Sequence, residues 1–415
     1  MKRAVKFLKI SGLVAAIVLA IGLIANAILI RNSGAELESR LAQLRTEQQP
    51  TSLSELAPTP VEADKNAAVM LRRVKDQIVA VAKDLETAKT DSGMFLPGDQ
   101  QAAAMRAAFA AYPQLIPTLQ EAADCEHYDS QLDYTLEFQD FLSQLLPVVQ
   151  NNRGVYRVLS GHVLLLAKDG KHDAALAECI TLLKLTRHLE REPTIVSHLV
   201  MLACRGVAIQ TANIVLQTGD VSPASREALM AELTLHDTSD SYKHALRTER
   251  ACGLSAYQDI TPWSQNWFMR AYWNRDVCHY LDLFSGEIAA ADLPPWKAPP
   301  IGFSDTESHP MVASIVPAVQ AARDANTRVR AAVRCLRVLT ALKGLPEEPG
   351  HLPVVSTLGL LEEATTDPFN GQPLIIKRLP GGWLVYSVGS NRQDDGGDLT
   401  TPLKDVGVGP QVTGK

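Results

Sequence analysis

The sequence has no concentrated patch of basic residues. Its formal charge is −6 and its pI is about 6.0, whereas a protein that neutralises the phosphates of a nucleic acid needs a local excess of lysine and arginine. The composition therefore argues against a nucleic-acid partner. A chain of 415 residues is long enough for about two or three domains. With 46% hydrophobic and 21% charged residues, its composition is that of a globular protein, so we expect a packed core rather than disorder.

The chain also lacks the short motifs of the common enzyme sites. It contains no GxSxG, no P-loop, no GxGxxG after a predicted strand and no HExxH. His188, Glu190, Glu192 and His198 gather near one predicted helix end without metal-ligand spacing, so we expect surface or singly hydrogen-bonded side chains there. No catalytic or cofactor-binding residue is predicted, and an enzyme is the less favoured class.

No two cysteines form a CxxC pair. An even number of cysteines allows three disulfides in an oxidising compartment, in any of about 15 pairings. Most of the cysteines nevertheless fall on predicted apolar helix faces, where cysteine packs as a small hydrophobic residue, so we expect buried free thiols. The six are Cys125, Cys179, Cys204, Cys252, Cys278 and Cys335.

One long hydrophobic run is present, at the N-terminus. Residues 10–30 are apolar and uncharged, and at about 1.5 Å of rise per residue such a helix crosses a hydrocarbon layer of about 30 Å. Basic residues before the run favour a cytoplasmic N-terminus, which predicts a single-pass protein of the inner (cytoplasmic) membrane with an extracytoplasmic body. These residues are Lys2, Arg3, Lys6 and Lys9.

A cleaved signal peptide is the alternative interpretation of this segment. Ala25, Asn26 and Ala27 would supply the small-residue cleavage site. Apolar sequence continues past Ala27 to Ile30, which favours a retained anchor.

Composition and periodicity divide the rest of the chain. We predict a mainly α-helical protein with a small antiparallel β-hairpin near the C-terminus. The predicted parts are a cytoplasmic tip and transmembrane anchor (1–31), a linker (32–60), a helical-hairpin array (61–292), a Pro-rich loop (293–310), a long helix with the hairpin (311–399) and a flexible tail (400–415). Within the linker we expect a short polar helix at 36–49, followed by a Pro/Ser/Thr segment that spaces the body from the membrane.

The helical array is clearest in its middle part. One predicted helix ends at Gly170, which readily adopts the left-handed conformation, and the next begins near His172 and ends before Pro193. This hairpin resembles a tetratricopeptide repeat in its Gly170, Ala175 and Pro193, which implies a packing style but no ligand, since no second copy follows at the same period. An apolar helix between Pro193 and Gly219 is expected to lie at the centre.

Residues 262–284 form an aromatic stripe that contains Trp263, Trp267 and Trp273. We expect the stripe to pack on the array. The alternative is a surface that enters the membrane interface or binds a partner.

Glu249 lies in an otherwise apolar helical stretch. A charged group on a packed helix needs a partner, and Arg205 on the central helix is the expected one.

The C-terminal part predicts a long helix followed by the hairpin. The helix covers residues 311–345, with Pro317 as a kink or start. "PLIIKRL" and "WLVYSVG" then flank a Pro-Gly-Gly turn and are rich in β-branched and aromatic residues. One face of this hairpin is expected to pack against the helix. The arginines expected on the other sides of the helix are Arg323, Arg328, Arg330, Arg334 and Arg337.

This unit resembles the C-terminal half of the major pseudopilin of type II secretion. The long helix, "DPFNGQPL", a hairpin ending in "YSVGS" and the acidic "DDGGD" carry the resemblance. It implies the fold of the tail and a calcium-binding loop, but the apolar segment lacks the acidic residue that a pseudopilin carries there. A membrane-anchored helical body with this ending also resembles a family of large envelope proteins from planctomycete-type bacteria, which implies no activity.

Asp394, Asp395 and Asp398 are the candidate metal ligands. Carboxylates and backbone carbonyls in such a loop are the oxygen ligands that Ca²⁺ takes, so calcium is the one candidate cofactor. The alternative is a solvated acidic turn, because Asp and Gly are also turn residues. Asp367, before Pro368, is expected to start a turn and to accept local backbone N–H groups.

These patterns favour a membrane-anchored extracytoplasmic interaction or scaffold protein with a protein partner. Helical arrays present grooves, and the sequence shows no reactive constellation. The alternative is a component of a secretion or pilus-like assembly. A hydrolase whose site is assembled from distant residues is the weaker alternative.

Overall fold

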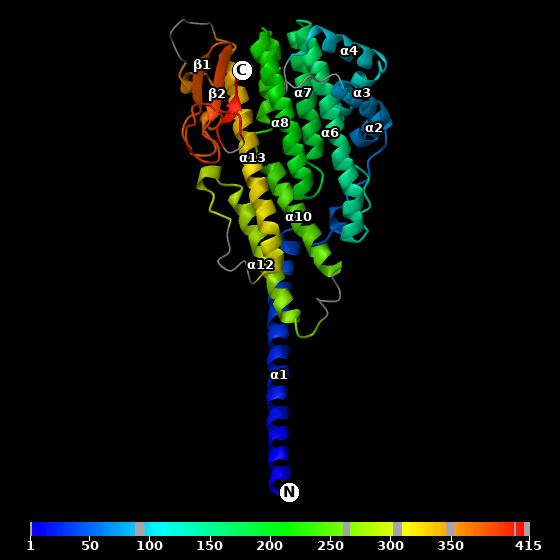
Figure 1. The fold of residues 1–415 in the computed structure, drawn as a ribbon, viewed down its shortest axis with the longest axis vertical. Coiled ribbons are helices and arrows are strands. Elements are labelled where there is room, and N and C mark those ends of the chain that lie inside the picture. The colour runs from blue at the N-terminus through cyan, green and yellow to red at the C-terminus, as the bar shows by residue number, and fades with distance from the viewer. Residues whose placement is uncertain are drawn as a thin grey trace.

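The computed structural model describes residues 2–87, 96–259, 266–301, 309–345, 353–401 and 404–410. The protein is mainly helical and ends in a small antiparallel sheet, as the sequence predicts (Figure 1). The helices are α1 (Lys2–Thr46), α2 (Ala67–Arg73), α3 (Lys75–Thr87), α4 (Asp99–Ala110), α5 (Leu115–Asp124), α6 (Phe138–Lys168), α7 (His172–Leu189), α8 (Ile195–Thr218), α9 (Pro223–Thr234), α10 (Asp240–Asp259), α12 (Arg270–Ala290), α13 (Pro310–Leu342) and α14 (Glu362–Thr365), with short 3₁₀ turns at Ser54–Leu56, Pro295–Lys297 and Val355–Thr357. The strands are β1 (Ile375–Leu379), β2 (Gly382–Ser387) and β3 (Val406–Val408).

α1 is a single helix that projects from the body as a stalk and continues into it (Figure 1). Its apolar part is long enough to cross a membrane and is exposed on all sides. The helix expected at 36–49 is present up to Thr46, but it is the continuation of α1 and not a separate element. The segment after it differs from the predicted spacer, because it lies on the body. Leu53 is buried there, and its backbone N–H donates to Ser255 Oγ at 2.7 Å.

The second half of α1 runs parallel to α12. Asn274 Nδ2 donates to Ser33 Oγ at 3.2 Å, and further along both helices Arg40 donates to both carboxylate oxygens of Asp282 at 2.9 and 3.0 Å. The least exposed positions of this part of α1 repeat about every seven residues, as in a two-helix coiled coil. They are Asn26, Ile30, Ser33, Gly34, Leu37, Arg40, Leu41 and Leu44.

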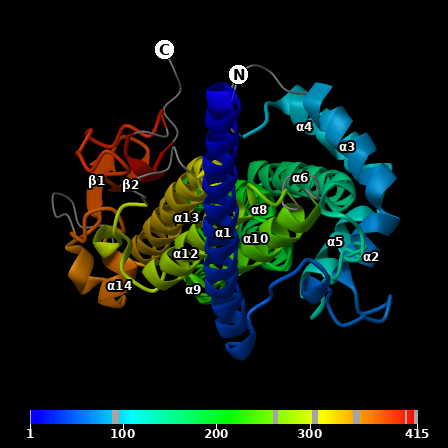
Figure 2. The ribbon, with the colours of Figure 1, turned by 90° about the horizontal axis from the view of Figure 1, so that it is seen from below.

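The core of the body is built on α6, α7, α8 and α13. α6 and α7 form the predicted hairpin, and Gly170 between them has a φ of 72°, which suits glycine. α8 is apolar enough to span a membrane, but 72% of that span is buried, so it is the central core helix that the sequence predicts. Viewed from below, α1 stands beside this core, with α2–α5 on one flank and the sheet on the other (Figure 2).

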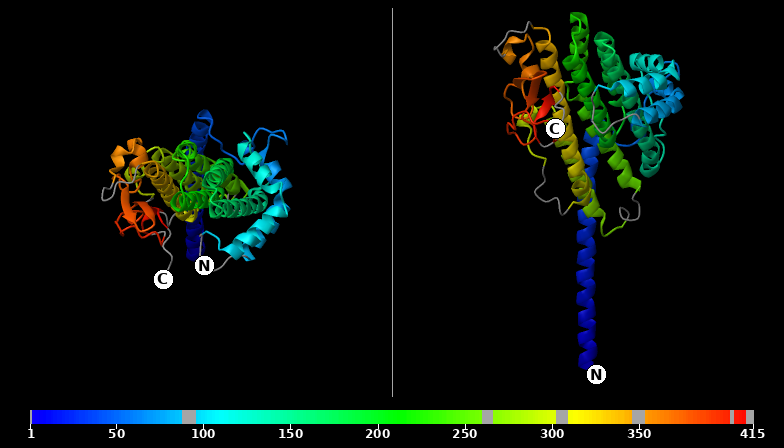
Figure 3. Two further views of the ribbon diagram at one scale, coloured as in Figure 1. Left: turned by 90° about the horizontal axis from the view of Figure 1, so that it is seen from above. Right: turned by 45° about the horizontal axis from the view of Figure 1, so that its top comes forward.

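The C-terminal sheet has the strand order β1-β2-β3, and all pairs are antiparallel. Leu379 pairs with Gly382, so Pro380 and Gly381 form the turn, with a φ of 97° at Gly381. The sheet packs against α13, as expected, and lies with it on one flank of the body (Figure 3). The prediction of a flexible tail at 400–415 is wrong for residues 406–408, which pair with β2; this strand is too short to give a periodic sequence signal.

Three amide side chains on one face of α8 hold the sheet against the core. Gln217 Nε2 donates to Trp383 O at 2.7 Å, Asn213 Nδ2 to Gly409 O at 2.9 Å and Gln210 Nε2 to Gly407 O at 3.3 Å. These amides are three and four residues apart, so one helix face satisfies backbone carbonyls near a sheet edge.

Several arginines of α13 pair with carboxylates of other segments. Arg330 and Arg334 bind Asp237 through their Nε atoms at 3.1 and 2.8 Å, and Arg337 Nη1 lies 3.8 Å from the same carboxylate. Arg323 pairs with Glu287 of α12. Pro317 lies inside the helix, which starts at Pro310. A buried arginine requires such partners, and these come from distant segments.

One part of the aromatic stripe packs on the body, and another part is exposed. Trp273 packs beside Tyr257 of α10, with 6.3 Å between the ring centroids, as expected. Trp267 and Phe268 form an edge-to-face pair at 5.0 Å but are exposed, which differs from the packed stripe that we expected. Trp263 lies outside the described residues.

Asp367 joins the turn before β1 to the end of β2. Its Oδ1 accepts from Phe369 N and Ser387 Oγ, each at 2.8 Å, and its Oδ2 accepts from Val388 N at 2.9 Å. The local bond to Phe369 is the one that the sequence predicts. The other two bonds, from Ser387 at the end of β2 and from Val388 after it, join "DPFNGQPL" to "YSVGS". The six cysteines are free, and all except Cys125 are buried.

We expect Asp367→Ala to destabilise the folded chain by roughly 3–5 kcal/mol, because it leaves two buried N–H groups and one hydroxyl without an acceptor. The melting temperature of the full-length protein in detergent measures this effect. Asp220→Ala, at an exposed position, is the matched control and should change it little. Equal melting temperatures for the two variants would refute the structural role of Asp367.

Candidate functional site

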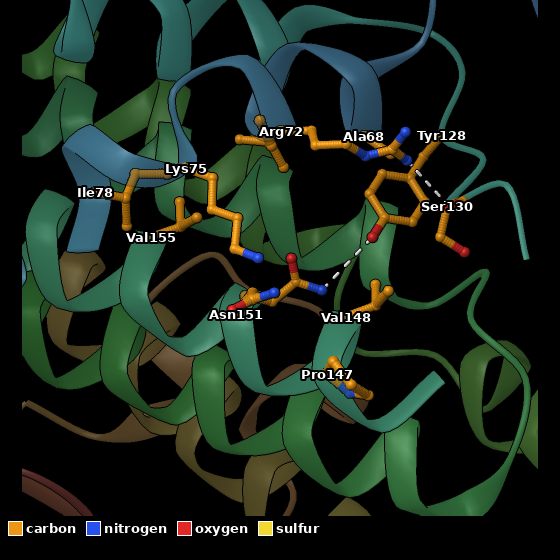
Figure 4. Close-up of a pocket in the computed structure, with 12 residues that line it drawn as sticks. Ala68, Arg72, Lys75, Ile78, Tyr128, Ser130, Pro147, Val148, Asn151 and Val155 are labelled. Atoms are coloured by element: carbon orange, nitrogen blue, oxygen red, sulfur yellow. Dashed lines mark hydrogen bonds between the residues drawn. The ribbon is translucent and has the colours of Figure 1, made fainter. Parts of the chain in front are cut away.

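A pocket of about 250 Å³ lies between α2, α3, the segment after α5, and α6 (Figure 4). It combines cationic, amide and hydroxyl side chains with an apolar floor. The described lining contains no acidic side chain. The lining residues are Ala68, Leu71, Arg72, Lys75, Ile78, Tyr128, Ser130, Pro147, Val148, Asn151, Asn152 and Val155.

Asn66 fixes one wall of this pocket. It is the N-cap of α2, and its Oδ1 accepts from Ala68 N and from Asp129 N, both at 3.0 Å. Its Nδ2 donates to Asp129 O at 2.8 Å. One buried amide therefore caps the helix that carries Arg72 and also holds the segment with Tyr128 against it.

α6 forms the opposite wall and contains Pro147. Proline has no N–H, so the carbonyl of Ser143 has no helical donor at that turn. Asn151 and Asn152 follow one turn later and bring amides to the pocket. Asn152 Nδ2 lies 3.5 Å from the Tyr128 hydroxyl, which links the two walls (Figure 4).

Arg72 and Lys75 supply the positive charge. Arg72 Nη1 donates to Gln131 Oε1 at 2.9 Å and Nη2 to Ser130 O at 3.2 Å, which orients the guanidinium along the rim. The Lys75 side chain extends into the space between α3 and α6 (Figure 4). Both residues are exposed, so their charges are available to a ligand from solvent.

Glu192 lies behind the polar wall of the pocket. Ser130 Oγ donates to Glu192 Oε2 at 3.2 Å, and Oε1 has no hydrogen-bond partner among the described residues. Burial raises the pKa of the Glu192 carboxyl to about 7, while hydrogen bonds from Ser130 and Tyr128 oppose the shift. This carboxyl therefore exchanges its proton near neutral pH, next to the wall of the pocket.

His188 supports Tyr128 from the other side. The two rings are stacked with 5.7 Å between centroids, and His188 Nε2 lies 2.9 Å from Ala122 O. Burial lowers the pKa of His188 to about 4, so its ring is neutral at pH 7. His188, Glu192 and His198 are buried because the α7–α8 turn is covered by neighbouring segments, so the surface alternative is wrong for them. The hydrogen-bonded alternative fits His188, at Ala122 O, and Glu192, at Ser130 Oγ.

The expected pairing of Glu249 with Arg205 is also wrong. Glu249 Oε2 accepts from Ile195 N at 2.8 Å, at the start of α8. Arg205 instead pairs with Glu190 and donates through Nε to Thr186 Oγ1 at 3.2 Å. The exposed backbone N–H groups at a helix start are strong partners for a carboxylate, and they outcompete the arginine here.

The three aspartates predicted as calcium ligands make separate contacts. Asp394 Oδ1 accepts from the Tyr386 hydroxyl at 2.8 Å, Asp395 Oδ2 from Asn391 Nδ2 at 2.7 Å, and Asp398 pairs with Lys404 at 2.5 Å. Lys404 lowers the pKa of the Asp398 carboxyl. Across the described part of the chain, no three His, Cys, Asp or Glu side chains form a group suited to a metal. Calcium binding in this loop stays a prediction.

Asp405, which the sequence did not single out, folds the same loop. It is buried and accepts from Gly397 N at 2.7 Å and from Asp395 N at 3.3 Å. Burial raises the pKa of its carboxyl. The loop is therefore held by an internal carboxylate that accepts backbone N–H groups.

None of the pocket residues was identified from the sequence. The usable signal was the polar "QNN" at positions 150–152, inside a helix that is otherwise strongly apolar, together with Pro147. Arg72 and Lys75 gave no signal, because a cation on an amphipathic helix is typical of a solvated face. Glu192 belongs to a group for which the sequence predicts surface or singly hydrogen-bonded side chains and no site.

Comparisons with known proteins do not assign a function to this pocket. No protein-family model matches the chain, and no curated protein or solved structure is significantly similar to it.

We expect Glu192→Gln to change how stability depends on pH. The folded-state pKa of about 7 lies above the usual value of 4.5, so the stabilisation by the protonated carboxyl is complete below about pH 4.5 and is lost as the pH rises through 7. The loss amounts to about 3 kcal/mol. Between pH 5 and pH 8 the melting temperature of the wild type should therefore fall relative to that of the glutamine variant.

Glu227→Gln, at an exposed position of α9, is the control and should follow the wild type. A Glu192→Gln profile parallel to the wild type would show that Glu192 does not titrate with a raised pKa.

Proposed function

We propose that this chain is a membrane-anchored, extracytoplasmic interaction protein that binds an anionic group of its partner in the pocket between α2, α3 and α6. The observation that carries the proposal is the pairing of Arg72 and Lys75 in a pocket whose described lining has no acidic side chain. A cationic pocket that also offers amides and hydroxyls suits an anion that needs several hydrogen bonds.

A retained anchor supports this function better than a cleaved leader. α1 passes without a break from the apolar run into the body, and Asn26, inside the alternative cleavage site, donates through Nδ2 to Trp267 O at 3.1 Å. Removal of residues 1–27 would take away this contact. The basic residues before the run favour a cytoplasmic N-terminus and so an extracytoplasmic body.

The size and chemistry of the pocket define the class of ligand. A volume of about 250 Å³ accommodates a carboxylate or phosphate with a short substituent, such as a side chain or a chain terminus presented by a partner. Arginine binds both kinds of anion through paired N–H groups, and lysine adds a point charge. Carboxylate and phosphate share this recognition, so the test separates them.

The packing of the sheet on α13 favours a secretion or pilus-like assembly as a second candidate, since a helix packed on a hairpin is what the pseudopilin resemblance implies. The helix that continues the anchor is nevertheless α1, which packs on α12 and not on the sheet. An interaction protein fits this arrangement better.

The proposal predicts that Lys75→Glu and Arg72→Ala each weaken anion binding at least about tenfold, because each removes a charge-assisted contact. Titrations of the full-length protein with inorganic phosphate and with succinate, followed by its melting temperature, measure the loss and show which anion is preferred. Arg73→Ala is the matched control, because Arg73 is an exposed neighbour on α2 that does not line the pocket.

Cross-linking in cells connects the pocket to a partner. Proteins recovered with the wild type and with Arg73→Ala, but lost with Lys75→Glu, would support the proposal. Identical recovery from all three, together with equal responses to both anions, would rule out the pocket as the binding site. Recovery of pilus or secretion components would favour the second candidate.

A further inference from the structure

Three apolar side chains are exposed at the lowest part of the body, where the chain enters α12. Trp267, Phe268 and Met269 are 39%, 70% and 37% exposed, and they follow one another without an intervening polar residue. We call these three residues the aromatic tip. A contiguous apolar group of this kind marks a surface that is covered in the working protein.

The aromatic tip lies beside the apolar part of α1. The contact between Asn26 Nδ2 and Trp267 O, at 3.1 Å, fixes its level along the stalk. Asn26 precedes the end of the apolar run at Ile30, and at about 1.5 Å per residue this difference places the tip about 6 Å inside that end. Figure 1 shows the start of α12 reaching down along α1 to this level.

The contacts between α1 and α12 fix the height of the aromatic tip along α1. Ser33 with Asn274 and Arg40 with Asp282 continue the same parallel pairing above the tip. The body therefore cannot lift the tip away from the apolar segment without breaking the α1–α12 interface. If residues 10–30 span a bilayer, the tip lies in the same leaflet.

The chemistry of the tip and its surroundings matches a membrane interface. Tryptophan is enriched where hydrocarbon meets headgroups, and phenylalanine and methionine favour the apolar side. Arg270 follows the tip directly and Arg31 follows the apolar run, and both are exposed. Long cationic side chains at this depth reach up to the headgroups while their methylene groups stay in apolar surroundings.

We propose that the aromatic tip inserts into the outer leaflet as a second membrane contact and that the occupant of this surface is lipid, with Arg31 and Arg270 at the headgroups. The proposal rests on the membrane anchor of the proposed function but not on its anion pocket. Together, one spanning helix and one shallow wedge hold the body in a single orientation on the membrane.

The test uses the full-length chain in phosphatidylcholine–phosphatidylglycerol vesicles, with an environment-sensitive fluorophore on one introduced cysteine. Phe268→Cys reports on the tip, Leu19→Cys on the middle of the anchor, and Val79→Cys is the control, since Val79 is 57% exposed on α3, far from the stalk. Cys125→Ser in all variants removes the one native thiol that is not buried.

We expect the label at Phe268 to lose emission to a lipid whose quencher lies near the headgroup, more than to one whose quencher lies at the end of the acyl chain. The label at Leu19 should show the opposite preference, and the label at Val79 should respond to neither. A second label at Met269→Cys should behave as the one at Phe268, which guards against a local effect of one substitution.

The alternative outcomes separate the membrane contact of the aromatic tip from the membrane anchor of the proposed function. Quenching at Leu19 without quenching at Phe268 overturns the membrane contact and leaves the anchor in place. No quenching at either position overturns both. A label at Phe268 that shifts to shorter wavelength but is not quenched overturns the lipid assignment and shows that protein, such as a second copy of the chain, covers the tip.

Discussion

The parallel packing of α1 on α12 is the constraint on which the rest of the structure depends. It begins at Asn26, inside the apolar run, and continues through Ser33 to Arg40 with a spacing of about seven residues. The helix that emerges from the apolar segment is therefore already part of the body. A flexible linker would have separated the orientation of the body from that of the apolar segment, and this packing couples them.

Above this base, the body is held together by buried polar groups with distant partners. Asp237 brings together three arginines of α13, Asp367 joins a turn to the end of β2, and Asn66 joins α2 to the segment near Tyr128. Asn66 and Asp367 are buried and the side chain of Asp237 is 7% exposed, so loss of any of these groups would leave unpaired donors or charges in the interior. These groups fix how the helical core, the sheet and the α2–α5 flank meet, which apolar packing alone specifies less strictly.

The sequence allowed prediction of features that depend on neighbouring residues. The hairpin at Gly170, the apolar α8 and the turn before β2 are specified by periodicity and by local turn chemistry, and all three are found. The pocket was not predicted, because its walls come from segments far apart in the chain. The burial of Arg334 and Glu192 was not predicted for the same reason: a charge is buried only where a distant partner or a covering segment meets it, and one sequence gives no sign of either.

The packing of α1 on α12 also fixes the position of the pocket relative to the apolar segment. Residues 147–155 of α6 lie about 14–26 Å along the helix from Phe138, at about 1.5 Å per residue, and Phe138 N donates to Asp259 Oδ2 at the C-terminal end of α10. The pocket is thus held at a set height above the apolar segment. Because the height of the pocket is fixed, a partner meets it at one level only, which raises the effective concentration of any group presented at that level. If the apolar segment spans a membrane, as we propose, a partner on that membrane is confined to the same level.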